Sequence, residues 1–344
     1  EVAVAVAHDD AAGLADIGPA PFRELAAVAA YLIVVADIVI VPEAARDVTR
    51  PPRRIEAAAR VAALEGVTPL AVLATVIDAA ILAAGVDAAI VAAGIAELAR
   101  PGQLVSLAVG DDASAIVTRR ALPLRSVTPS GTYGGTVEVV VDPDADAGSA
   151  WLAARRLHDE VSILGPLGRG FPISTNPVPV VVAAVGAGAA STVWLVETLR
   201  RAGCQVPRVV IGGEDERRLL GVIEARRLVG SVTTVVPDAG VGEDLAYRMQ
   251  VALDATLRQH ETALVYASGD VTSLAAITAA AQRHSVPVQA AFGVPMPCGT
   301  GLCRACALPV ANAAGEVTPV RCCTEGPVLP ADRMAWAQLL EVSA

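Results

Sequence analysis

Five of the six cysteines of this 344-residue chain lie between positions 298 and 323, in a segment rich in glycine and proline. Cys298, Cys303 and Cys306 follow the spacing C-x4-C-x2-C, and Cys322 and Cys323 come sixteen and seventeen positions after Cys306. This concentration of thiols constrains the fold more than any other feature, because the segment must fold around whatever the thiols bind.

Clustered cysteines form a disulfide framework, a zinc site or an iron–sulfur cluster, or they are buried without a ligand. The chain does not open with a basic stretch followed by an apolar stretch, so we expect a cytoplasmic protein with reduced thiols, which argues against disulfides. A structural zinc site typically has two short C-x2–4-C hooks. One long and one short interval with a distant fourth cysteine is typical of a plant-type [2Fe-2S] cluster. We predict this cluster, with zinc and unliganded thiols as the alternatives.

The residues between the cysteines suit a cluster of negative net charge. Gly299 and Gly301 can take positive φ angles and direct backbone N–H groups toward the sulfur atoms, and Arg304 adds a positive charge. The spacing predicts three metal ligands and leaves the fourth open between two neighbours: Cys298, Cys303, Cys306 and either Cys322 or Cys323. Cys204, outside this segment, is predicted to be a buried thiol.

Composition excludes several other kinds of chemistry. All 26 basic residues are arginine and the net charge is −10, so lysine-based covalent catalysis is excluded and no nucleic-acid partner is expected. The apolar runs are too short or too interrupted to span a bilayer, so no membrane partner is expected. The four histidines are scattered, and no nucleophile, base and orienting group can be recognised. We therefore expect no catalytic side chain, and chemistry that depends on cofactors.

The middle of the chain divides into two regions of different pattern. Short apolar stretches separated by turn residues predict strands of a small antiparallel barrel at 71–77, 87–93, 103–108, 114–118 and 135–141. Continuous apolar runs alternating with helical stretches predict a parallel sheet with helices on both faces, with strands at 180–185, 206–211, 232–236 and 262–267 and helices at 192–202 and 274–284.

Several longer strings carry a resemblance to a known family. They are "ARPGQLVSL" at 99–107, "ILGPLGRGF" at 163–171, "PMPCGTGLCRACALPV" at 295–310 and "VRCCTEGPVLPADRMAW" at 320–336. With these strings the chain resembles the electron-transfer subunit of dihydroorotate dehydrogenase B, a ferredoxin-reductase-like family. In that family the fourth cysteine is followed by an acidic residue and Gly-Pro-Val, so the resemblance implies Cys323 as the fourth ligand.

The resemblance also implies a multidomain fold with α/β and β parts. It implies an antiparallel β-barrel flavin domain at 69–176, a parallel α/β nucleotide-binding domain at 177–290 and a small [2Fe-2S] domain at 291–344. An additional N-terminal α/β segment at 1–68 has no role that the sequence indicates, although its pattern predicts a strand and a helix.

Flavin-binding residues follow from the family's Arg-Pro-x-Ser strand, its Gly-Thr helix start and its Gly-Pro-Leu-Gly turn. The residues implied are Arg120, Gly148, Ser149, Gly165, Pro166 and Gly168. The Arg120 guanidinium would pair with a phosphate, and Ser149 supplies the hydroxyl that threonine supplies elsewhere. Ala121 and Pro123 stand where the family has proline and serine.

The nucleotide site is implied by three further segments. "AVGAGAAS" at 184–191 keeps Gly186 and Gly188 of the family's glycine-rich turn after the first strand. Glu214, with Asp215, follows the second strand, where a carboxylate favours NAD over NADP. In "YASGDVTS" at 266–273, Gly269 matches the family's Cys-Gly-Pro near the nicotinamide.

The activity implied is that of an oxidoreductase subunit of pyrimidine biosynthesis. An FMN-containing catalytic partner would oxidise dihydroorotate, and electrons would pass through the [2Fe-2S] cluster to FAD and then to NAD+. One alternative is another FAD and [2Fe-2S] reductase subunit, linked to a hydrogenase or a ferredoxin. The other is a non-catalytic assembly subunit that has lost flavin or NAD binding.

Overall fold

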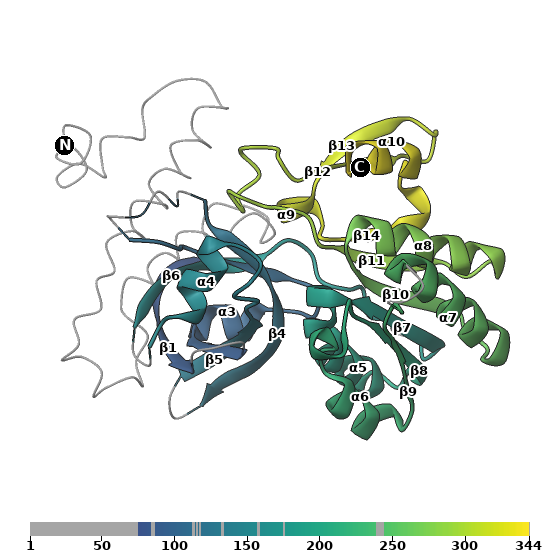
Figure 1. The fold of residues 1–344 in the computed structure, drawn as a ribbon, viewed down its shortest axis with the longest axis horizontal. Coiled ribbons are helices and arrows are strands. Elements are labelled where there is room, and N and C mark those ends of the chain that lie inside the picture. The colour runs from purple at the N-terminus through teal and green to yellow at the C-terminus, as the bar shows by residue number, and fades with distance from the viewer. Residues whose placement is uncertain are drawn as a thin grey trace.

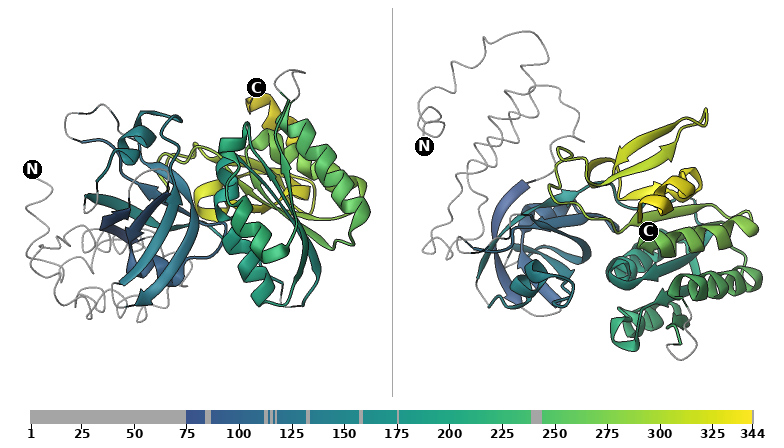
Figure 2. Two further views of the ribbon diagram at one scale, coloured as in Figure 1. Left: turned by 60° about the horizontal axis from the view of Figure 1, so that its bottom comes forward. Right: turned by 45° about the horizontal axis from the view of Figure 1, so that its top comes forward.

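The computed structural model describes residues 75–83, 87–111, 114, 116, 118–131, 134–156, 159–174, 176–238 and 244–343. The strand and helix expected within 1–68 lie outside this part of the chain. Figure 1 shows a barrel, a sheet flanked by helices, and a C-terminal region that contacts both, and Figure 2 shows the same arrangement from two further sides. Among the described residues, no helix is both long enough and apolar enough to cross a membrane.

The first part is a closed barrel with strand order β1-β2-β5-β4-β3-β6, in which all neighbours are antiparallel. Its elements are β1 (Thr75–Ala83), β2 (Asp87–Val91), α3 (Ala93–Leu98), β3 (Leu104–Leu107), β4 (Arg120–Gly131), β5 (Gly134–Val140), α4 (Ala147–Ala153) and β6 (Glu160–Leu167). Val105 and Leu107 of β3 and Val137 and Val139 of β5 pack in its interior. Alternate residues of these two strands therefore face the barrel interior, as the period of a strand requires.

The predicted barrel is confirmed, but its strands differ in detail. The strand predicted at 114–118 is wrong, because no described residue there is in a strand. Ser114 donates its backbone N–H and its hydroxyl to the Asp111 carbonyl at 3.0 Å each, so the chain turns before β4 begins at Arg120. β6 was not predicted at all, and it contains Gly165 and Pro166 of the string expected to form a turn.

The second part is a six-stranded sheet in the order β14-β11-β10-β7-β8-β9. Its parallel strands are β7 (Pro179–Val185), β8 (Gln205–Gly212), β9 (Val232–Val235), β10 (Leu264–Gly269) and β11 (Val288–Phe292). The helical elements between them are η5 (Gly186–Ser191), α5 (Thr192–Arg201), η6 (Glu216–Arg218), α6 (Val222–Val229), α7 (Leu245–Gln259) and α8 (Val271–Arg283). The predicted parallel sheet is therefore confirmed.

Alternate residues of β7 show that helices cover both faces of this sheet. Val180 and Val182 belong to a hydrophobic cluster with residues of α5 and α6. Val181 and Ala183 belong to a different cluster, with residues of α7 and α8. The strand is buried on both sides, which is why it has an uninterrupted apolar sequence.

The C-terminal part begins after β11 and returns to the sheet. It contains the hairpin β12 (Ala307–Ala311) and β13 (Val317–Arg321), then α9 (Cys322–Glu325), β14 (Val328–Pro330), η7 (Ala331–Arg333) and α10 (Trp336–Ser343). β14 pairs antiparallel with β11 and so extends the six-stranded sheet at its edge. This part of the chain is therefore not a free appendage, since one of its strands completes the neighbouring sheet.

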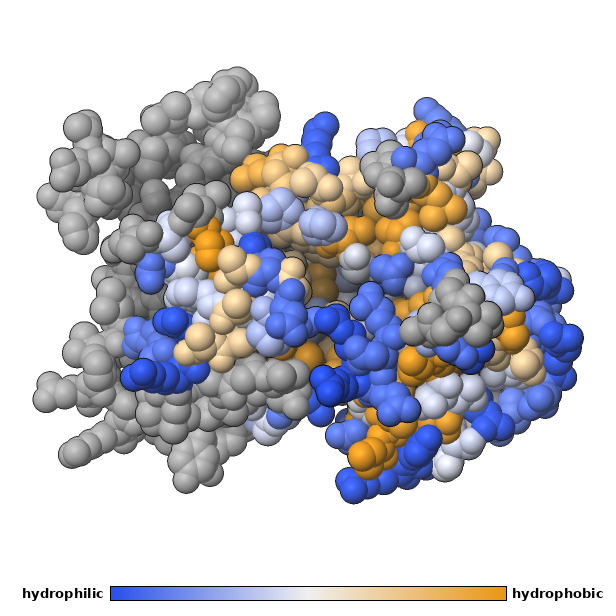
Figure 3. All heavy atoms as spheres, in the orientation of Figure 1, coloured by the Kyte–Doolittle hydropathy of each residue, from blue (hydrophilic) through white to orange (hydrophobic). Residues whose placement is uncertain are grey.

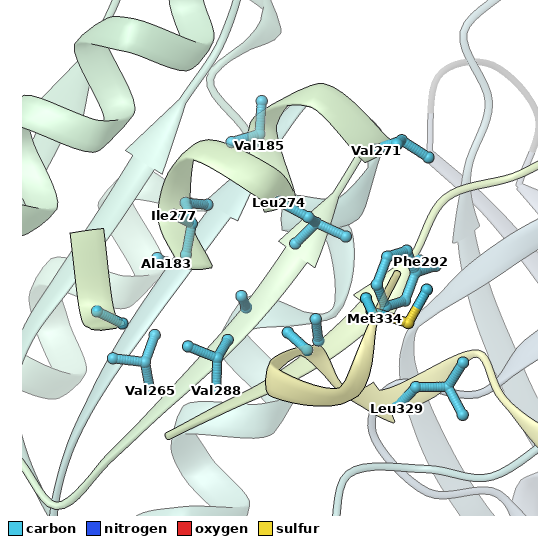
Figure 4. Packing of buried hydrophobic residues seen from close by; sticks show 14 of the residues in the cluster. Ala183, Val185, Val265, Val271, Leu274, Ile277, Val288, Phe292, Leu329 and Met334 are labelled. Carbon is cyan, nitrogen blue, oxygen red and sulfur yellow. The ribbon is translucent and has the colours of Figure 1, made fainter. Parts of the chain in front are cut away.

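One hydrophobic cluster joins all three parts. It contains Leu167 of the barrel, Phe292 at the end of β11, and Leu329 and Met334 of the C-terminal region. Figure 4 shows Phe292, Leu329 and Met334 close together beside α8. Phe292 also packs against Trp336, with ring centroids 5.8 Å apart. This shared core fixes the cysteine segment relative to the barrel and the sheet.

Candidate functional site

The β12–β13 hairpin brings the two groups of cysteines together. Ala307, directly after Cys306, pairs with Arg321, directly before Cys322. The Cys322 N–H then donates to the Cys306 carbonyl at 3.0 Å. The interval between the third cysteine and the last two is therefore the length of one hairpin, whose register places them side by side.

The segment from Cys298 to Cys306, called the cysteine loop below, turns its backbone N–H groups toward sulfur. Gly299, Gly301 and Arg304 have φ angles of +68°, +81° and +56°, which curve the chain tightly. The Thr300 N–H lies 3.4 Å from Cys298 Sγ, and the Ala305 N–H lies 3.5 Å from Cys303 Sγ. Donors of this kind stabilise negatively charged sulfur.

The hydrogen bonds of Cys298 favour its thiolate form. Burial raises the pKa of this thiol, but donors from Cys303 and Thr300 outweigh that effect and lower the pKa to about 6. Cys298 and Cys303 are thus neighbours. Since the donors are already in place around the sulfur, this end of the loop is suited to bind a cation through a thiolate.

The two adjacent cysteines, Cys322 and Cys323, have different surroundings. Cys323 contacts the Cys306 thiol and accepts a hydrogen bond from the Gly301 N–H, and burial raises its pKa to about 12. The Cys322 thiol lies 3.7 Å from the Phe292 carbonyl in the core. Burial raises its pKa as well. The structure therefore brings Cys323 to the other cysteines and places Cys322 in the core.

The thiols fit a two-iron cluster. Within the described part of the chain, no three Cys, His, Asp or Glu side chains gather closely enough to hold a single metal ion. A two-iron cluster needs a different arrangement, because each iron takes two thiolates. Cys298 lies beside Cys303 and Cys306 beside Cys323, which gives the two pairs that such a cluster needs.

The cysteine loop contacts the barrel on one side and solvent on another. A Cβ added at Gly299 would lie 3.1 Å from Leu167 and 3.4 Å from Ser106, both in barrel strands. Leu302 is 85% exposed and Cys303 is also exposed. Figure 3 shows apolar surface over this region at the top of the molecule. A group bound by the loop would thus lie between the barrel and the solvent-exposed surface of the protein.

The residues predicted to bind flavin phosphate form an anion cradle at the start of α4. Asp146 caps this helix, and its carboxylate accepts hydrogen bonds from the Gly148 N–H at 2.7 Å and the Ser149 N–H at 3.1 Å. Its Oδ1 atom is also 2.7 Å from an Arg120 guanidinium nitrogen. The Arg120 guanidinium, together with the Ser149 and Gly148 donors, holds the pKa of Asp146 well below its usual range.

The cradle therefore fits an anion, but a carboxylate of the chain itself fills it here. The space is tight, since a Cβ added at Gly148 would lie 2.9 Å from the Arg120 guanidinium carbon. A diphosphate can use these donors only if Asp146 moves aside. The sequence carried a signal for this residue, because an aspartate two positions before Gly-Ser at a helix start is a strong N-cap.

Residues of the Gly-Pro-Leu-Gly string join the barrel to the C-terminal region. The Gly168 carbonyl accepts a hydrogen bond from the Gln103 side chain at 2.7 Å. A Cβ added at Gly168, which has a φ of +70°, would lie 2.2 Å from the Gly326 carbonyl oxygen. The Arg169 N–H donates to that same oxygen. Gly165 and Pro166, in β6, lead into this joint, so three strings that are distant in the sequence meet here.

The glycine-rich turn and Gly269 lie together at the carboxyl ends of β7 and β10. The strand order reverses between these two strands, which is where open α/β sheets bind ligands. A Cβ added at Gly188 would lie 2.7 Å from the Gly269 nitrogen, while Gly186 has open space beside it. Ser268, which sequence reasoning did not single out, donates its hydroxyl to the Gly188 carbonyl at 2.8 Å and fixes the turn.

Two polar features of this edge fit a dinucleotide. The Thr192 hydroxyl, at the start of α5, is buried and has no hydrogen-bond partner among the described residues. Such an orphan group at a helix N-terminus suits a phosphate oxygen. Glu214 lies past the end of β8 with its side chain exposed. The nearby Arg218 guanidinium is 3.8 Å from Glu214 and 2.8 Å from Asp142 of the barrel.

Known proteins share this arrangement. A family model for the iron–sulfur cluster binding domain of dihydroorotate dehydrogenase B matches residues 295–335. The dihydroorotate dehydrogenase B (NAD(+)) electron transfer subunit of Desulforamulus reducens is 30% identical over 247 residues, 70% of this chain and 89% of that protein. The subunit of the same name from Geobacillus kaustophilus is 28% identical over 239 residues, 69% of this chain and 87% of that protein.

A solved structure shares the fold. It is that of an NADH-dependent reduced ferredoxin–NADP oxidoreductase, described for flavin-based electron bifurcation. It aligns with a TM-score of 0.59 and 23% sequence identity, covering 80% of this chain and 93% of that one.

The fold and the cysteine segment define a ferredoxin-reductase-like protein that carries an iron–sulfur cluster domain at its C-terminal end. Within this class, the chain belongs to the family of dihydroorotate dehydrogenase B electron transfer subunits. The family and fold class predicted from the sequence are thus confirmed, and the predicted cofactors FAD, an iron–sulfur cluster and NAD agree with both. The individual binding residues stay predictions.

Proposed function

We propose that this chain is the electron-transfer subunit of an NAD-dependent dihydroorotate dehydrogenase of pyrimidine biosynthesis. Its residues would bind a [2Fe-2S] cluster, FAD and NAD+ in the order in which electrons pass between them. Bound FAD exchanges a hydride with the nicotinamide and single electrons with the cluster, so it links two-electron and one-electron chemistry. We propose a cytoplasmic location, which the six free cysteines support.

The observation that carries this proposal is the position of the cysteine loop. Gly299 lies against barrel strands β3 and β6, while Leu302 and Cys303 reach the surface. A cluster in the loop would thus be near a flavin on the barrel and near a protein bound outside. We propose a catalytic subunit as that partner, as the words "electron transfer subunit" in the name of the relatives suggest. We further propose that this partner contains FMN.

The residues proposed for each cofactor are those that the resemblance to the family implies. For the cluster they are Cys298, Cys303, Cys306 and Cys323. For FAD they are Arg120, Gly148, Ser149, Gly165, Pro166 and Gly168. For NAD they are Gly186, Gly188, Glu214 and Gly269. We assign them to a barrel domain at 69–176, a nucleotide-binding domain at 177–290 and a cluster domain at 291–344.

Rapid mixing with NADH tests this function. In the anaerobic wild-type protein we expect NADH to bleach the flavin absorbance first and the cluster absorbance afterwards. The Cys323→Ala variant should keep the first phase and lack the second. A wild-type protein in which NADH bleaches neither chromophore would contradict the proposal.

We expect the Ser268→Ala substitution to weaken NADH binding about fivefold, because the Gly188 carbonyl loses a hydrogen bond worth about 1 kcal/mol and the turn loses its support. Isothermal titration calorimetry measures this change. Thr278→Ala is the matched control, since it removes a buried hydroxyl bonded to the Leu274 carbonyl at 2.7 Å in α8. The control should lower thermal stability without changing NADH affinity, and equal affinity losses in both variants would remove Ser268 from the site.

We expect Leu302→Asp to weaken association with the catalytic subunit about tenfold or more. Leu302 is 85% exposed in the free chain, and the partner would bury this apolar side chain, whereas an aspartate would have to give up its hydration there. Surface plasmon resonance with the purified partner measures this affinity. Ile223→Asp is the control, because Ile223 is 63% exposed in α6, on another part of the molecule. Unchanged affinity for Leu302→Asp would place the partner elsewhere.

A further inference from the structure

Ser106 is a buried polar residue for which the fold supplies no partner. It lies in β3 between Val105 and Leu107, which face the barrel interior. Since successive side chains of a strand alternate, Ser106 faces outward on the same side as Leu104, which belongs to the core shared with the cysteine segment. Ser106 is fully buried, and its hydroxyl has no hydrogen-bond partner among the described residues.

Burying a hydroxyl without a hydrogen-bond partner destabilises the folded protein by about 1–3 kcal/mol. The position of Ser106 between the barrel and the cysteine loop therefore needs an explanation. Its cross-strand neighbours are Ala121 and Leu164, whose side chains offer no acceptor. The Ser106 carbonyl is fixed by Arg119, whose Nη2 atom donates to it at 2.9 Å and to the Ser162 carbonyl at 2.7 Å. The backbone that carries the free hydroxyl is therefore held in place.

The cysteine loop packs against the side chain of Ser106. A Cβ added at Gly299 would be 3.4 Å from the Ser106 Cβ, which is ordinary packing distance. Gly299 follows Cys298, one of the proposed ligands. Within the loop, N–H groups of Thr300 and Ala305 already point at sulfur atoms. On the barrel side, the unpartnered Ser106 hydroxyl can add a further donor.

We propose that the Ser106 hydroxyl donates a hydrogen bond to a sulfur atom of the iron–sulfur centre, across the seam between the barrel and the cysteine loop. The inference rests on the proposed function in that it requires the cluster to be present. Hydrogen bonds to sulfur stabilise the added negative charge of the reduced state and so raise the reduction potential. Ser106 thus contacts the cluster directly and tunes its reduction potential from the barrel side.

The test is a redox titration of the full chain, monitored by electron paramagnetic resonance, after iron, sulfide and flavin have been measured. For Ser106→Ala we expect the reduction equilibrium of the cluster to shift about tenfold toward the oxidised form, which is about 59 mV for a one-electron couple. Ser106→Thr keeps the hydroxyl and should stay near the wild-type potential. Ser106→Cys has a weaker donor of similar size, so its cluster potential should lie between those of the alanine and threonine variants. It replaces the alanine variant in the test if that variant does not fold.

Ser126→Ala is the matched control, because this barrel hydroxyl already has a partner, the Glu138 carboxylate at 2.6 Å. It should leave the cluster potential unchanged. A cluster potential in Ser106→Ala and Ser106→Cys equal to that of the wild type would overturn the inference, and a shift of the flavin potential instead would assign the hydroxyl to flavin. A wild-type protein without iron and sulfide would overturn the proposed function itself, and this inference with it.

Discussion

The Cys323→Ala variant should contain no iron–sulfur cluster, whereas Cys322→Ala should retain it. Cys323 contacts Cys306 and the Gly301 N–H, so its removal leaves one iron with a missing thiolate. Cys322 contacts the Phe292 carbonyl in the core, and its removal leaves only a small cavity that costs about 1 kcal/mol. Iron and sulfide analysis of anaerobically purified variants measures the difference.

Two further substitutions complete this comparison. Cys303→Ala should lose the cluster as fully as Cys323→Ala does, because it removes a thiolate from the other pair. Cys204→Ala should keep its full iron and sulfide content, since this thiol is buried among residues of the six-stranded sheet, away from the cysteine loop. Loss of the cluster in Cys322→Ala together with retention in Cys323→Ala would exchange the roles of the two neighbours.

The second large effect is expected at the anion cradle of α4. Arg120→Ala should lower FAD affinity by about tenfold or more, because a charge-assisted hydrogen bond to phosphate is worth about 1.5–3 kcal/mol. Asp146→Asn should raise FAD affinity, since the asparagine still caps the helix but no longer places a negative charge on Arg120. Flavin fluorescence quenching during titration of the flavin-free protein measures both affinities.

Asp146 remains charged at neutral and mildly acidic pH, so lowering the pH within this range does not neutralise the carboxylate as the Asp146→Asn substitution does. Its pKa is depressed by Arg120, and its contribution to stability is therefore present above the ordinary aspartate pKa and is lost only as the pH falls through the depressed value. Arg125→Ala is the control, because Arg125 lies in the same strand and pairs with Glu224 at 3.6 Å. If Asp146→Asn lowers FAD affinity, the carboxylate is part of the flavin site rather than a competitor for it.

The sequence predicted those elements whose formation depends on residues close together in the chain. The apolar run of β7 and the C-x4-C-x2-C spacing could be interpreted directly, because burial on both faces and a tight loop each leave a sequence signature. The strand predicted at 114–118 was wrong because side-chain and backbone hydrogen bonds between Ser114 and Asp111 favour a turn over an apolar alternation.

Other features depend on contacts between distant segments. The different roles of Cys322 and Cys323 follow from the register of the β12–β13 hairpin, which spacing does not determine. Asp146 is recognisable as a helix cap, but its ion pair with Arg120 needs β4 and α4 to be adjacent. Ser106 looks like an ordinary strand residue in the sequence. Only the packed structure shows that its hydroxyl is buried without a hydrogen-bond partner and that the residue lies against Gly299.

We propose that one chain carries both a flavin and a [2Fe-2S] cluster. The first experiment is the visible absorption spectrum of anaerobically purified protein, recorded together with its iron, sulfide, zinc and flavin content. We expect flavin bands with a broad iron–sulfur shoulder, about two irons and about one FAD per chain. A colourless protein, or one that contains zinc and no flavin, would contradict the account, because the motifs would then support a scaffold and not electron transfer.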